Sequence, residues 1–110
     1  MYATAWHNGR EPGEPTGYGL RITKADRDRY FDSSWEHVVL ELEGIEPTTV
    51  PLGPSFWRSC TELRSAAIGS WLLESGAAPW AQGNPPGISV APIDGQRFAA
   101  RLLRRRSLQS

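Results

Sequence analysis

The chain has 110 residues, of which 39% are hydrophobic and 22% are charged, and its twelve basic side chains balance its twelve acidic ones. That is enough apolar material for one small core and too little length for two. No apolar run is long enough to cross a membrane, and the first residues lack a signal-peptide pattern. A single cysteine, Cys60, excludes an internal disulfide and a thiolate-only zinc site, so we expect a cytoplasmic protein without metal or cofactor.

The amino-terminal third predicts two strands and a short helix. Over 2–7, larger side chains alternate with Ala3, Ala5 and His7, and this aromatic and β-branched content reads as a strand; residues 18–22 alternate in the same way as a second strand. Glycine and proline dominate the segment between these strands, so it is expected to be a loop. Thr23 stands three residues before Asp26 in a capping pattern, which predicts a helix over about 24–31.

The middle of the chain predicts a strand pair. Residues 35–43 alternate with one apolar and one polar face, which favours an antiparallel sheet open to water on one side. Residues 48–52 are expected to return as the partner strand. Pro51 lacks the N–H that a central strand needs, so this strand is predicted at an edge of the sheet.

The segment over about 55–75 predicts one long amphipathic helix. Gly53-Pro54-Ser55 ends the preceding strand, and Gly76 suits the position after a helix. At 100° per residue, most of the large apolar side chains fall on one arc of the helix, and they are Phe56, Trp57, Cys60, Leu63, Ala67, Ile68 and Trp71.

The carboxyl-terminal third predicts a hairpin and a tail. Residues 88–93 and 96–103 read as strands, and Asp94-Gly95 between them is a strong turn signal. We therefore expect a single globular domain over 1–103, followed by a basic, polar tail over 104–110.

These elements together predict an α+β domain. We expect about six mostly antiparallel strands, forming a half-open barrel, packed on the long helix over about 55–75, with a short helix over about 24–31. The alternative is an α/β sandwich in which the second and third strands pair in parallel across the short helix.

The charges are balanced overall but uneven along the chain. Residues 1–54 hold five basic and nine acidic side chains, whereas residues 55–110 hold seven basic and three acidic ones, so the two parts carry −4 and +4. Such polarity can steer one end of a molecule to a polyanion, or let copies associate. Eleven of the twelve basic residues are arginine, which is typical of GC-rich bacterial genes and also suits bidentate recognition of phosphate.

Candidate binding residues follow from this distribution. Arg64 falls within the apolar arc of the predicted helix, where it is expected to reach water, to meet a glutamate of the sheet, or to face a ligand at the sheet edge. Trp80 lies in a proline- and glycine-rich loop, where it either covers the core or is presented to a partner. Aromatic rings combined with guanidinium groups are typical of single-stranded nucleic-acid binding. The candidates are Arg64, Trp80, Arg97, Arg101, Arg104, Arg105 and Arg106.

His7 and His37 are the only histidines, and neither has the spacing of a metal or catalytic motif.

Three functions are compatible with these observations. We expect a small non-enzymatic module that binds nucleic acid through its basic carboxyl-terminal half. The alternatives are a protein-interaction or self-assembly module, including a homo-oligomer formed through the oppositely charged halves, and a small metal-independent nuclease or hydrolase that uses His7 and His37. No membrane partner is expected.

Overall fold

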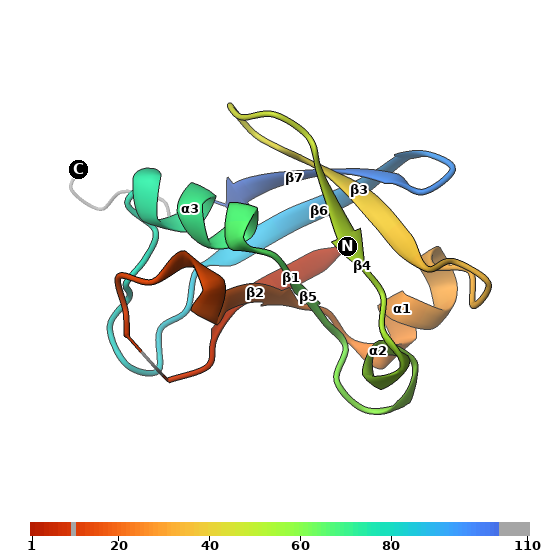
Figure 1. Cartoon of the computed structure of the whole chain (residues 1–110), viewed down its shortest axis with the longest axis horizontal. Helices are drawn as coiled ribbons and strands as arrows, with labels where there is room; N and C mark the ends of the chain where they lie inside the picture. The colour runs from red at the N-terminus through yellow and green to blue at the C-terminus, as the bar shows by residue number, and fades with distance from the viewer. Residues whose placement is uncertain (10, 104–110) are drawn as a thin grey trace.

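A curled sheet organises the chain. The computed structural model describes residues 1–9 and 11–103, and within them seven strands form one sheet in the order β4-β3-β7-β6-β1-β2-β5. Neighbouring strands are antiparallel except for the parallel pair β3 and β7. The edge strands β4 and β5 approach each other, so the sheet is a nearly closed barrel (Figure 1). The strands are β1 (Tyr2–His7), β2 (Tyr18–Arg21), β3 (His37–Leu42), β4 (Thr48–Pro51), β5 (Glu62–Arg64), β6 (Gly87–Asp94) and β7 (Arg97–Leu103).

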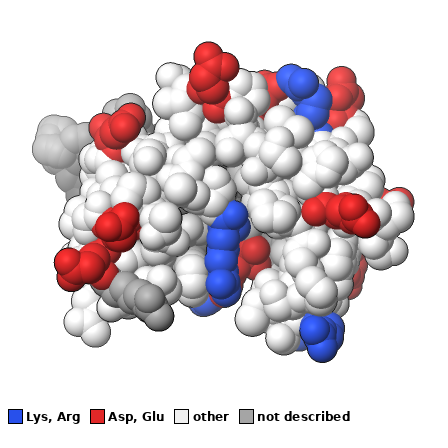
Figure 2. Space-filling view, in the orientation of Figure 1, with Lys and Arg blue, Asp and Glu red and all other residues white. Residues whose placement is uncertain are grey.

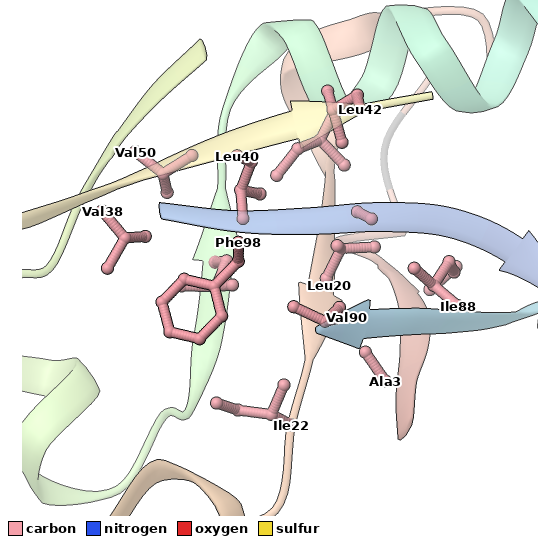
Figure 3. Packing of buried hydrophobic residues seen from close by; sticks show 14 of the residues in the cluster. Ala3, Leu20, Ile22, Val38, Leu40, Leu42, Val50, Ile88, Val90 and Phe98 are labelled. Carbon is pink, nitrogen blue, oxygen red and sulfur yellow. The ribbon is translucent and has the colours of Figure 1, made fainter. Parts of the chain in front are cut away.

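The core fills the inside of this barrel. Because successive side chains of a strand point to opposite faces, buried residues alternate with more exposed ones, most clearly in β3 and in the first half of β6. Figure 3 shows apolar side chains from β1, β2, β3, β4, β6 and β7 converging on one interior, with Phe98 among them. The interior residues that the figure labels are Ala3, Leu20, Ile22, Val38, Leu40, Leu42, Val50, Ile88, Val90 and Phe98.

Short helices close the two ends of the barrel. At one end lie α1 (Lys24–Tyr30) and α2 (Pro54–Arg58), and the rings of Phe31 and Phe98 stack there with centroids 4.9 Å apart. At the other end α3 (Ala66–Glu74) packs against the 3-10 turn η1 (Pro15–Gly17), and the Trp71 indole N–H donates to the backbone oxygen of Glu43 at 2.9 Å. Figure 1 shows α3 on the left and α1 and α2 on the right.

Several expectations are confirmed. The fold is α+β, and α1 begins where the capping pattern predicts, because the Thr23 hydroxyl accepts the backbone N–H of Asp26 at 3.1 Å. Strand β4, which contains Pro51, lies at an edge of the sheet. The hairpin of β6 and β7 is present, although its register pairs Asp94 with Arg97, so Gly95 is the first residue of the turn. No helix in the described ranges is long and apolar enough to cross a membrane.

The expected long helix over about 55–75 is wrong. The segment forms α2, then strand β5, then α3. Thr61 explains the break, because its hydroxyl donates to the backbone oxygen of Ile22 at 2.5 Å and its own backbone oxygen accepts the Ile22 N–H at 3.0 Å. Leu63 is then buried beside its register partner Leu20. Pairing with β2 satisfies these backbone groups, and Ser65 caps the new helix α3 by accepting the N–H of Ala67.

Two further details of the expected topology change. The additional strand β5 raises the strand count from about six to seven. The sheet is mostly antiparallel, as expected, and its one parallel pair joins β3 to β7, whereas the sandwich alternative had placed parallel pairing between the second and third strands. The two oppositely charged parts of the sequence do not form two separate halves of the molecule. In the sheet, β4-β3 and β1-β2 come from the acidic part, and β7-β6 and β5, which lie between or beside them, come from the basic part. The expected tail over 104–110 lies outside the described residues.

Candidate functional site

A tryptophan and two arginines meet on the outer side of β1, β2 and β5. The register places Trp6, Gly19 and Arg64 in one row across the three strands, and Thr4, Arg21 and Glu62 in the next row. Apart from Gly19, which is buried and has no side chain, these residues alternate with the buried ones along their strands, so their side chains point away from the core. We call the surface made by Trp6, Gly19, Arg21, Glu62 and Arg64 the Trp6 face.

Glu62 holds both arginines of the Trp6 face. Arg21 donates from Nε and Nη2 to Glu62 Oε2 at 3.0 and 2.6 Å, and Arg64 donates from Nη2 to Glu62 Oε1 at 2.8 Å. The glutamate side chain is only 7% exposed, whereas those of Arg21 and Arg64 are 55% and 56% exposed. Burial raises the pKa of Glu62, but the hydrogen bonds and charges of the two arginines outweigh burial, so the net pKa is lowered. The carboxylate thus stays ionised and orients two accessible cations.

Both guanidinium groups also lie beside the indole of Trp6. The Cζ atom of Arg64 is 4.6 Å from the centre of the ring, and that of Arg21 is 6.0 Å from it. Gly19, between Trp6 and Arg64, makes this approach feasible, because a Cβ there would lie 3.3 Å from Arg64 Cγ and 2.6 Å from the backbone oxygen of Leu63. Such cation–π contacts stabilise a guanidinium over a ring by about 0.5–2 kcal/mol each.

This arrangement offers a flat ring and two cations that have already lost much of their conformational freedom. A ligand that has a planar ring and a nearby anionic oxygen can stack its ring here and, at the same time, accept hydrogen bonds from a guanidinium group. Figure 2 shows a group of basic side chains near the middle of the displayed face, in the region where Figure 1 draws β2 and β5, with acidic side chains mainly around the rim.

The predicted arginines do not gather at one place. Arg64 lies on the edge strand β5, and not on a helix as expected, and its carboxylate partner is Glu62; its role in binding a ligand stays a prediction. Arg97 and Arg101 lie on β7, which is on the opposite side of the seven-stranded barrel. Arg97 forms an ion pair with Glu41 of β3. Arg104, Arg105 and Arg106 lie outside the described residues.

Trp80 packs against the aromatic residues at the ends of β1 and β2. Its ring lies 5.6 Å from that of Tyr18 and 6.4 Å from that of His7, and together with Pro12 and Pro79 these rings line a cavity of about 130 Å³. Burial raises the pKa of Tyr18, whose hydroxyl donates to the backbone oxygen of Pro12 at 2.5 Å. Trp80 therefore covers part of the core and does not contribute to the Trp6 face; its predicted role in binding stays a prediction.

The two histidines lie at opposite ends of the barrel. Strands β1 and β3 run in the same direction, because β1 is antiparallel to β6, β6 is antiparallel to β7, and β7 is parallel to β3. His7 is the last residue of β1, whereas His37 is the first residue of β3. The hydrolase alternative requires them in one cleft, and the strand directions separate them. Within residues 1–9 and 11–103, no group of three or more metal-ligating side chains is found.

Trp6, Arg21 and Glu62 were missed by sequence reasoning. The alternation of residues 18–22 already turns Arg21 toward solvent, but its partner Glu62 lies 41 positions later in the chain, on another strand.

A scan against protein-family models finds no match to this chain, and comparisons with curated proteins and with solved structures find none either.

Proposed function

We propose that this protein is a non-enzymatic module that binds single-stranded nucleic acid across the Trp6 face. The observation that supports the proposal is the nearly buried carboxylate of Glu62, which holds two half-exposed guanidinium groups beside Trp6. Pairing two arginines with one carboxylate leaves one net positive charge on the surface. Because the arginines are oriented before a ligand arrives, binding loses less side-chain entropy.

Single-stranded nucleic acid fits this surface better than a duplex does. An unpaired base presents a flat face that can stack on an aromatic or guanidinium plane, and the adjoining phosphate can accept hydrogen bonds from an arginine. A duplex hides its bases in the stack and would use only the cations. Two cations can neutralise about two phosphates, so we expect weak binding to a short segment of the strand and not contact with many phosphates along it.

The test is the salt dependence of binding to labelled oligo-dT and oligo-U, measured by fluorescence anisotropy. Two arginines that neutralise two phosphates of a single strand give a slope of about −1.4 in log affinity against log salt, so tenfold more salt weakens binding about 25-fold. Arg64→Gln or Arg21→Gln should reduce that slope to about −0.7. Trp6→Leu should weaken binding by about 1–3 kcal/mol through the loss of stacking and change the slope little, because Glu62 still holds both arginines.

Arg97→Gln is the matched control, since Arg97 is half exposed and paired with a glutamate, as Arg64 is, but lies on the other side of the barrel. It should leave both affinity and slope unchanged. If neither oligonucleotide binds at the lowest salt, the proposal is wrong. If Arg97→Gln weakens binding as much as Arg64→Gln does, the Trp6 face is the wrong surface.

A further inference from the structure

A second outer surface gathers the exposed apolar side chains. In the described part of the chain, four large hydrophobic residues are exposed, by between 39% and 58%, and they are Tyr2, Ile45, Ile93 and Leu103. Tyr2 and Leu103 occupy outward positions of β1 and β7, Ile93 lies at the bulge of β6, and Ile45 lies in the turn between β3 and β4. All four border the outer side of one continuous run of strands, β3-β7-β6-β1.

Small residues form the floor between these side chains. Ala99 of β7 lies between its register partners Glu41 of β3 and Ala91 of β6, and Ser89 occupies the next outward position along β6. Together with the turn of Ile45 they line an open cavity of about 500 Å³. We call this surface, from Glu41 and Glu43 across to Tyr2, the Ala99 face. Exposed apolar side chains around such a cavity are typical of surfaces that bind proteins.

The charges of the Ala99 face indicate what kind of protein it binds. Glu43 and Arg101 both line the cavity: Glu43 directly follows β3, its backbone N–H donates to the backbone oxygen of Ala100 of β7 at 3.0 Å, and Arg101 is the next residue of β7. Arg97 already pairs with Glu41, but within residues 1–9 and 11–103 neither Glu43 nor Arg101 forms an ion pair through its side chain. One surface thus holds one unpaired carboxylate and one unpaired guanidinium side by side.

We propose that the Ala99 face binds a second copy of this chain in a twofold-symmetric dimer. In such an interface the same patch meets itself, so the patch must be self-complementary. A twofold axis that passes between Glu43 and Arg101 brings each arginine opposite the glutamate of the other copy, and the exposed apolar side chains cover the neighbouring alanines. The net charge of zero means that two copies do not repel each other.

The size of the face sets the expected strength. Four strands at about 4.8 Å spacing, each about six residues long, make a surface roughly 20 Å across. Two such surfaces together cover roughly 800 Å², which is less than the about 1,200 Å² or more that stable complexes bury, so the dimer should be weak and form in a concentration-dependent way. The two faces meet at β1, which contributes Tyr2 at its start to the Ala99 face and Trp6 near its end to the Trp6 face.

The test is sedimentation equilibrium of the full chain and of two charge-reversed variants, Glu43→Arg and Arg101→Glu. Each variant alone places like charges opposite each other and should weaken self-association about tenfold or more. An equimolar mixture of the two variants restores both opposite-charge contacts, so it should dimerise about as well as the unmodified chain. Repulsion within one copy cannot produce this recovery, because it is the same in the mixture.

Two variants away from the face serve as the control pair. Glu74→Arg on α3 and Arg58→Glu on α2 change exposed charges in the same way, and they should leave self-association unchanged both separately and mixed. Circular dichroism melts of all four variants establish that each is folded. A wild-type chain that stays monomeric at every concentration overturns the proposal, and so does a mixture that associates no better than either variant alone.

Discussion

The Trp6 face and the Ala99 face use the same side-chain types to different ends. On the Trp6 face, the glutamate side chain is 7% exposed and binds two arginines, which are packed beside a ring. On the Ala99 face, the paired glutamate Glu41 is 32% exposed and has one arginine partner, while the floor consists of small residues. An ion pair stabilises a fold mainly when it is shielded from water and part of a network. The Trp6 face should therefore be rigid and contribute to stability, whereas the Ala99 face is left open for contact.

Two glycines give the largest test of this comparison. Gly19 lies on the Trp6 face, where an added Cβ would be 2.6 Å from the backbone oxygen of Leu63. Gly87 lies beside Tyr2 at the border of the Ala99 face, where an added Cβ would be 2.7 Å from the ring of that exposed tyrosine. The backbone of β5 cannot move without breaking its pairing with β2, whereas the Tyr2 ring can swing into solvent. We expect Gly19→Ala to lower the free energy of unfolding by about 3 kcal/mol, and Gly87→Ala by less than about 1 kcal/mol.

Urea unfolding followed by tryptophan fluorescence measures both values. The two variants add the same single methyl group, so the difference between them isolates the neighbour that the methyl group meets. Equal losses would mean that β5 shifts as readily as the Tyr2 side chain does, and the rigidity assigned to the Trp6 face would then be wrong.

The next effect in size comes from neutralising the two glutamates. Glu62→Gln removes the charge that binds Arg21 and Arg64 and leaves a nearly buried amide with fewer acceptors, so we expect a loss of about 1–3 kcal/mol. Glu41→Gln removes a partly exposed pair with Arg97, for which we expect a few tenths of a kcal/mol. The same unfolding measurement compares them, and a loss from Glu41→Gln that equals or exceeds the loss from Glu62→Gln contradicts the proposed difference.

The sequence predicts those parts of the fold whose signals are local. The capping pair Thr23 and Asp26 predicts the start of α1, and the turn after Asp94 predicts the hairpin of β6 and β7. Both depend on residues close together in the chain, and the alternating apolar residues of the strands predict their buried faces. These features therefore follow from short stretches of sequence, whatever their tertiary surroundings.

The segment around β5 shows where local signals fail. Leu63 is buried equally well on one face of a helix or of a strand, so the apolar period alone does not distinguish them. The decision comes from Thr61, whose hydrogen bonds to Ile22 connect residues 39 positions apart. The sequence contained a partial signal, because Ser65 is a favourable N-cap residue in the middle of the expected helix. The Trp6 face was missed for the same reason, since it exists only once β5 pairs with β2.

The pH dependence of stability is the smallest of these effects and tests Glu62 most directly. The folded-state pKa of Glu62 is lowered, against the effect of burial, by Arg64 and Arg21. A carboxyl group with a lowered pKa contributes stability above its unfolded value of 4.5, and this contribution is lost as the pH falls through the folded value. The difference in unfolding free energy between the unmodified chain and Glu62→Gln should therefore be constant from pH 7 to about pH 5 and shrink below 4.5. Other carboxyl groups titrate in both proteins and cancel in the difference. If the difference stays constant or grows toward acid pH, the two arginines do not hold the Glu62 carboxylate in the ionised form, and the orientation that the Trp6 face requires has another source.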